Sequence, residues 1–154
     1  MALLSIDQRL EEMGVVLPEP GVPVANYVTA RRAGNLLFLS GHVCRRDGKI
    51  AAGKLGDTMN ADEGYALARV TALDMLANAR SVLGSLDNVS VIKLVGFVNS
   101  SPHFADQPAV VDGASDLLVD VFGAERGKHA RSAVGVNALP LGAAVEIEAV
   151  FEVG

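Results

Sequence analysis

One arginine and two glutamates near the C-terminus are the residues best placed to do chemistry. Arg131 lies in a stretch whose residue types alternate, and Glu146 and Glu148 lie in a second alternating stretch after the Leu-Pro-Leu-Gly turn at 139–142. A period of two is typical of β-strands, because successive side chains point to opposite faces. The pattern predicts two paired strands that hold a guanidinium near a carboxylate.

The chemistry that such a pair would support is the binding of a small carboxylic acid. A guanidinium is planar and permanently charged, and it can bind both oxygens of a carboxylate at once. The same group can instead form a structural ion pair with Glu146 or Glu148. The residue pattern alone favours the ion pair, and it establishes no more than an α+β domain with one candidate anion site.

The other reactive side chains form no catalytic or metal-binding motif. His42, His103 and His129 have no metal-ligand spacing, and a single cysteine, Cys44, excludes an intramolecular disulfide and a multi-cysteine metal site. His42 and Cys44 would share a strand face without a third residue to orient them, so we expect ordinary packing there. The glycine-rich stretch 48–57 lacks P-loop spacing. We expect neither a metal site nor a phosphate-binding loop.

Composition limits the classes of partner. The 154 residues are enough for one domain, and a net charge of -5 offers no general attraction to nucleic acid or to acidic membranes. A mean hydropathy of +0.33 is high for a small monomer and suggests buried subunit contacts. The N-terminal stretch has too short an apolar run and too many acidic residues for a signal peptide, and no apolar run is long enough to span a bilayer, so we expect a cytoplasmic protein.

The expected architecture is a single α+β domain over residues 1–154. A short helix and a proline-rich connector fill residues 1–24, and the core covers 25–153. Within the core we expect a hairpin, a helix, a buried central strand, a second helix and the C-terminal hairpin, at about 27–43, 60–83, 89–98, 107–122 and 129–153. Asp106 should cap the second helix and Gly123 should end it. This order predicts a largely antiparallel sheet with both main helices on one face.

Four segments together resemble the RidA (YjgF) family of reactive-intermediate deaminases. They are Tyr27 ahead of the Gly34-Asn35 turn, LLFLSG ending at Gly41, ARSAVGVNALP at 130–140 and VEIEAV at 145–150. The resemblance covers residues 25–153, and its specific part is the succession R-S-x-V, LP and VEIEA. It implies a chorismate-mutase-like fold and a homotrimer with ligand clefts between neighbouring subunits, which would explain the high hydropathy.

The resemblance also implies roles for individual residues. Arg131 takes the place that binds the carboxylate of a 2-imino acid, and Glu146 takes the place that activates the attacking water, with release of ammonia and without a cofactor. Tyr27 would line the cleft, with Ser40 and Gly41 at its border.

Three features of the sequence depart from the family pattern. Ala133 stands where many members have cysteine, and Asp112 stands where the family has asparagine. The charge of Asp112 would disfavour an incoming carboxylate if it faced the cleft. After LFLSG the chain reads HVC in place of QIP, which brings His42 and Cys44 near the site.

Three functions follow from these observations. The first is an imine or enamine deaminase that acts on products of amino-acid metabolism. The second is a non-catalytic binder of small carboxylates, for which Asp112 is the supporting feature. The third is an endoribonuclease or translation inhibitor, a label often attached to this family, to which an acidic chain gives little support.

Overall fold

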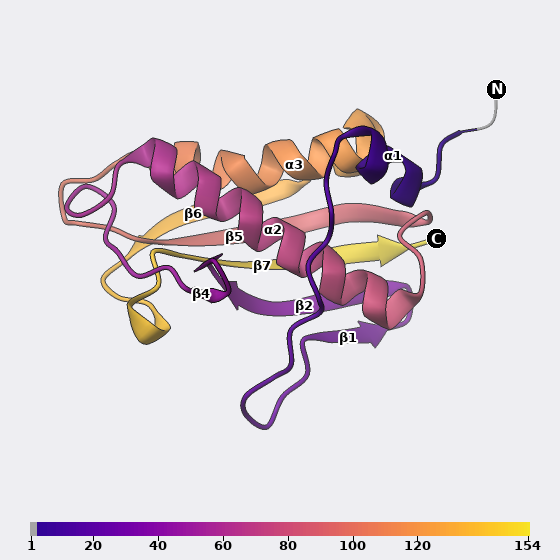
Figure 1. The fold of residues 1–154 in the computed structure, drawn as a ribbon, viewed down its shortest axis with the longest axis horizontal. Helices are drawn as coiled ribbons and strands as arrows, with labels where there is room; N and C mark the ends of the chain where they lie inside the picture. Colours follow the sequence, from indigo (N-terminus) through magenta and orange to yellow (C-terminus); the bar gives the residue numbers. More distant parts are fainter. Residues whose placement is uncertain (1–2) are drawn as a thin grey trace.

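Two long helices cover one face of a five-stranded sheet in the computed structural model, which describes residues 3–154 (Figure 1). Residues 1 and 2, the start of the expected N-terminal segment, lie outside the described residues. The helices and strands are α1 (Ile6–Glu12), β1 (Ala30–Ala33), β2 (Leu36–Val43), β3 (Arg45–Arg46), β4 (Lys49–Ile50), α2 (Ala61–Leu83), β5 (Val89–Asn99), α3 (Gln107–Gly127), β6 (Ala130–Val136), a 3-10 turn (Pro140–Gly142) and β7 (Val145–Val153). The expected α+β fold with a short N-terminal helix is confirmed.

The ends of the long helices follow from local chemistry. The Asn60 side chain accepts a hydrogen bond from the backbone of Glu63, whose side chain bonds back, so α2 begins with a complete capping box. α3 differs from expectation at both ends. Asp106 occupies its N-cap position but makes no capping hydrogen bond, and Gly123 breaks the helix with φ 79° without ending it, so that a further turn continues to Gly127.

The sheet has the strand order β1-β2-β7-β5-β6, and only the β5–β6 pair is parallel. The first hairpin turns at Gly34, which has a φ of +60°, as predicted. The predicted C-terminal hairpin is wrong, because β5 lies between β6 and β7. The reason is the helix between β5 and β6: a β-helix-β crossover returns the chain to the same end of the sheet, and the next strand then lies parallel beside the first.

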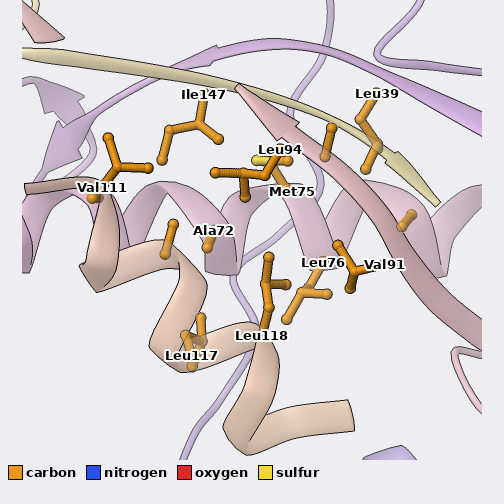
Figure 2. Packing of buried hydrophobic residues seen from close by; sticks show 14 of the residues in the cluster. Leu39, Ala72, Met75, Leu76, Val91, Leu94, Val111, Leu117, Leu118 and Ile147 are labelled. Atoms are coloured by element: carbon orange, nitrogen blue, oxygen red, sulfur yellow. The ribbon is translucent and has the colours of Figure 1, made fainter. Parts of the chain in front are cut away.

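The core lies between the two helices and the sheet. Figure 2 shows Leu76 of α2, Leu118 of α3 and Leu94 of β5 pointing into this layer, where each is fully buried. Burying a side chain of this size stabilises the fold by about 1.5–3 kcal/mol. Phe122 packs edge-to-face on Phe151, with ring centroids 6.2 Å apart, and joins α3 to β7. The helix face of the sheet is therefore a closed core.

The opposite face of the sheet is only partly buried. Phe38 of β2 is 46% exposed and Val134 of β6 is 40% exposed, while Val95 and Phe97 of β5 are half-buried. The sequence predicted that β5 would be buried on both faces, and within one protomer only its helix face is fully buried.

None of the helices in residues 3–154 is long and apolar enough to cross a membrane.

Candidate functional site

Glu146 lies on β7, on the sheet face away from the helices. Its neighbours in the strand, Val145 and Ile147, are fully buried in the core, which directs Glu146 outward. Its carboxyl group lies against Gly41 of β2, since a Cβ built on Gly41 would stand only 2.2 Å from Oε1 of Glu146. Burial, and then repulsion from Glu148, raise the pKa of the Glu146 carboxyl. This shift makes the Glu146 carboxylate a stronger base than the carboxylate of an exposed glutamate.

A bulge in β2 presents Gly41 to this carboxyl. The pairing with β7 shifts register between Leu39 and His42, so Ser40 and Gly41 are the irregular residues. Ser40 donates from Oγ to the Val28 carbonyl at 2.6 Å and from its backbone N–H to Thr29. These bonds tie the bulge to the segment that carries Tyr27.

His42 fixes the other side of the bulge. Its Nδ1 lies 2.6 Å from the carbonyl of Ser40, and its Nε2 lies 3.0 Å from Nδ2 of Asn78 in α2. Because the carbonyl accepts and the amide donates, the ring is neutral with its proton on Nδ1. Burial lowers the pKa of His42 and favours the same state. His42 therefore links α2 to the bulge and has no ring nitrogen left for a substrate.

Two cavities meet beside the bulge. One of about 690 Å³ lies between the N-terminal connector, the end of β2 and α2, and Tyr27, Ser40 and Gly41 are in its wall. The other, of about 500 Å³, includes Tyr27, Ser40 and Glu148. We call Tyr27, Ser40, Gly41 and Glu146 the Glu146 group; the structure brings these four predicted residues together.

Arg131 lies on the edge strand β6 and points toward α3. Its Nη1 donates to Asp112 Oδ1 at 2.6 Å and to Ser115 Oγ at 3.2 Å. The side chain is 24% exposed, and that of Asp112 is 49% exposed. Ala133, two residues further along β6, is half-buried against the core. The predicted ion-pair partners Glu146 and Glu148 are therefore wrong, because they lie across β5 and on the opposite sheet face.

The pairing with Asp112 occupies only one end of the guanidinium. Both hydrogen bonds use Nη1, and within residues 3–154 Nε and Nη2 have no hydrogen-bond partner. Nε–H and Nη2–H are parallel donors that match the two oxygens of a carboxylate. Asp112 thus orients Arg131 and leaves its bidentate edge available.

Ser115 and His129 complete this arrangement, and neither was predicted from the sequence to be part of a site. His129 Nδ1 lies 2.6 Å from the Gly127 carbonyl, and its Nε2 lies 2.9 Å from Oγ of Ser115. The Ser115 hydroxyl therefore donates to His129 and accepts from Arg131. Burial, followed by the charge of Arg131, lowers the pKa of His129 and keeps it neutral.

The sequence did contain a signal for Ser115. It follows Asp112 by three residues in α3, a spacing that places two side chains on one helix face. We call Asp112, Ser115, His129 and Arg131, together with Ala133, the Arg131 group. In one protomer it is separate from the Glu146 group.

Cys44 takes no part in either group. It is fully buried, where its thiol donates to the Ala51 carbonyl and accepts from the backbone N–H of Val145. Burial raises the pKa of this thiol, so it stays protonated. Within residues 3–154 no cluster of His, Cys, Asp and Glu has the arrangement that a metal ion needs.

Similarity to known proteins identifies the family of this chain. Residues 7–152 match the family described as "YjgF/chorismate_mutase-like, putative endoribonuclease". The chain is 46% identical to protein TCP17 of Trypanosoma cruzi over 146 aligned residues. This alignment covers 94% of this chain and 91% of TCP17.

Two crystal structures have closely similar folds. Atu1372 of Agrobacterium tumefaciens, a protein of unknown function, superposes with a TM-score of 0.88 at 41% identity, over 97% of this chain and 92% of that one. A Shewanella oneidensis MR-1 protein that carries the endoribonuclease description has a TM-score of 0.92 at 30% identity, over 97% of this chain and all 100% of the other. The fold, the length of the match and the identity together place this chain in the YjgF/chorismate-mutase-like family.

Proposed function

We propose that this protein hydrolyses 2-imino acids, or the enamines that tautomerise to them, into 2-keto acids and ammonia. The observation that carries the proposal is the Glu146 carboxyl, which is half-buried, has a raised pKa and lies against Gly41, a residue in the wall of the larger cavity. A carboxylate in this state is suited to general-base catalysis at neutral pH.

The reaction needs little more than a clamp and a positioned water. In the proposed mechanism, the bidentate edge of Arg131 holds the substrate carboxylate. Glu146 accepts a proton from a water molecule while the oxygen of that water bonds to the imine carbon. Glu146 returns that proton to nitrogen, which gives a carbinolamine. The hydroxyl proton of the carbinolamine then passes to nitrogen, the carbon–nitrogen bond breaks, and ammonia leaves as the carbonyl forms. Because an imine carbon is already electrophilic, positioning and proton transfer supply the catalysis.

The two groups have to meet across a subunit boundary in this proposal. Arg131 and Glu146 lie on opposite faces of the sheet, with β5 between their strands, so one protomer does not hold a substrate between them. The partly exposed apolar face that carries Phe38 and Val134 offers a surface for association. We propose a homotrimer in which the Glu146 group of one subunit faces the Arg131 group of its neighbour.

A non-catalytic carboxylate-binding protein is the second candidate. The observation in its favour is that Asp112 lies 2.6 Å from Arg131 and offsets the charge of the clamp. Such a protein would bind 2-keto acids saturably but would leave imine lifetimes unchanged. The cytoplasmic setting stays a prediction under both candidates.

The test is a competition assay with an L-amino-acid oxidase. The oxidase releases 2-imino acids, semicarbazide traps them as a chromophore, and an imine hydrolase lowers the initial trapping rate. Wild-type protein should lower the rate, and Arg131→Ala and Glu146→Gln should not, whereas Glu152→Gln, a matched change on the same strand, should behave as wild type. No effect of the wild type with leucine, methionine or arginine as the source amino acid would reject the proposal, and RNA cleavage by the same preparation would favour the endoribonuclease description.

A further inference from the structure

One nitrogen of Arg131 makes two hydrogen bonds, and together they fix the plane of the guanidinium. Nη1 donates to Asp112 Oδ1 at 2.6 Å and to Ser115 Oγ at 3.2 Å. The N–H groups of a guanidinium lie in one plane, so two acceptors on Nη1 define the direction of the Nε–Nη2 edge. With Asp112 alone, the group is free to turn about a single hydrogen bond. Ser115 therefore supplies the second point that sets this edge.

The Ser115 hydroxyl is turned away from the hydrogen bond that its own helix offers. A serine or threonine inside a helix commonly donates to the backbone carbonyl four residues earlier. Thr71 of α2 does so, with Oγ1 2.8 Å from the Leu67 carbonyl. Among residues 3–154, Ser115 makes no such bond to Val111, and its oxygen lies 2.9 Å from Nε2 of His129. An acceptor outside α3 thus holds the hydroxyl away from its local partner.

The direction of the hydrogen bonds explains why this acceptor is needed. His129 Nδ1 lies 2.6 Å from the Gly127 carbonyl, so the ring proton is on Nδ1 and Nε2 is an acceptor. The Ser115 hydroxyl donates its single proton to Nε2, which leaves its lone pairs for Arg131, a group that only donates. Burial lowers the pKa of His129 and keeps the ring in this neutral form. Donation therefore runs in one direction, from Arg131 through Ser115 and His129 to the Gly127 carbonyl.

The ends of α3 and β6 bring these groups together. Ser115 lies on α3, Arg131 lies on β6, and His129 lies in the short connection between the two elements. Gly127, whose carbonyl anchors the His129 ring, is the last residue of α3. The helical turn that follows Gly123 therefore places the anchor of the chain of hydrogen bonds.

We propose that His129 is a positioning residue for the carboxylate clamp and acts on Arg131 through Ser115. His129 holds the Ser115 hydroxyl away from its own helix, and Ser115 then fixes the guanidinium plane before a carboxylate arrives. A group that is already oriented loses less conformational freedom on binding, so the complex is tighter. The inference rests on the proposed function, since it takes Arg131 as the group that holds the substrate carboxylate.

The test measures carboxylate binding without turnover, by calorimetry with 2-oxobutyrate. Ser115→Ala and His129→Phe should each weaken binding about tenfold, as expected for the loss of one hydrogen bond. Ser115→Thr keeps a hydroxyl and His129→Gln supplies an amide oxygen as acceptor, so both should retain most of the affinity. Ser81→Ala, a matched change at an exposed position of α2, should bind as wild type does. In Ser115→Ala, the further change His129→Phe should add little, because His129 acts through Ser115.

Kinetics separate this positioning role from a structural one. A loosened clamp should raise KM for the imino acid and leave kcat nearly unchanged, because Arg131 binds the carboxylate in the ground state and in the transition state alike. A smaller fraction of folded protein would instead lower kcat at constant KM. A lowered kcat with an unchanged KM in Ser115→Ala and His129→Phe would overturn the inference.

The failures of the two proposals are distinguishable. If the wild type binds 2-oxobutyrate, the two variants bind it about tenfold more weakly and no imine is hydrolysed, the inference is supported and the deaminase proposal is rejected. If imine is hydrolysed but folded Ser115→Ala and His129→Phe bind as wild type does, the inference is overturned and the deaminase proposal stands. Equal losses in His129→Phe and His129→Gln would also overturn the inference, because the shape of the ring, and not its acceptor, would then be what matters.

Discussion

A methyl group added at Gly41 should disable the water-activating carboxylate without disturbing the fold. In Gly41→Ala the new Cβ would lie 2.2 Å from Oε1 of Glu146, whereas ordinary contact begins near 3.4 Å. The oxygen must therefore move by about 1.2 Å. Gly41 is exposed and does not have the positive φ that restricts a position to glycine, so alanine fits its backbone.

The expected loss of rate follows from how closely a general base must be positioned for proton transfer. A general base has to stay within about 2.6–3.2 Å of the atom whose proton it takes. A misplacement of about 1 Å costs on the order of 100-fold in rate, equivalent to about 2.7 kcal/mol of transition-state stabilisation. Glu146 is a flexible side chain, so the free energy of unfolding should change by less than about 1 kcal/mol.

The assay is imine hydrolysis in the oxidase–semicarbazide competition, with thermal unfolding measured in parallel. Gly154→Ala, at a position where the nearest atom to the added methyl is the Asn88 carbonyl oxygen at 3.5 Å, is the control and should match wild type. In Glu146→Gln the further change Gly41→Ala should add little, because both remove the same function. Full hydrolysis by a folded Gly41→Ala protein would refute the role assigned to Glu146.

Four further predictions address the clamp, the base, the cavity and the assembly. Arg131→Lys should weaken 2-oxobutyrate binding at least about tenfold by calorimetry, because an ammonium has no bidentate edge; unchanged affinity would contradict the clamp. The kcat/KM of wild type should fall with decreasing pH through the raised pKa of Glu146, and that acid limb should be absent from any residual activity of Glu146→Gln. Burial raises the pKa of Asp74 in the folded state, so its contribution to stability is most favourable in acid and is lost as pH rises. Asp74→Asn should therefore raise Tm at pH 7, and this gain in Tm should disappear below the ordinary carboxyl range. A gain in Tm that is independent of pH would argue against burial as the cause. Phe38→Asp should dissociate the proposed homotrimer in gel filtration with light scattering, and a trimer that stays intact would show that the outer sheet face is not the interface.

Local sequence determined the elements well where chemistry acts within a few residues. The capping box of Asn60 and Glu63 and the positive φ of Gly34 are properties of short segments, and both were predicted. The limits of α3 were predicted less well. Gly123 interrupts the helix as expected, but one more turn follows, and such a turn depends on packing beyond the glycine.

Strand pairing and side-chain partners required the tertiary structure. Arg131 was expected beside the glutamates of β7 because the two stretches are adjacent in sequence. The structure places β5 between them and pairs Arg131 with Asp112. A two-residue period reports which residues share a face of one strand, but it contains no information about which strand lies alongside.

The sequence alone therefore determined the family, the α+β class and the residues for which we propose carboxylate binding and water activation. Only the tertiary structure decided that Glu146 lies over Gly41 and that Arg131 is oriented by Asp112 and Ser115. It also decided that the two groups lie on opposite faces of one sheet and that Asp74 of α2 lines the larger cavity. The physical reason is that residue types and local periods are encoded along the chain, whereas burial, charge balance and cavity shape arise from segments that meet only on folding.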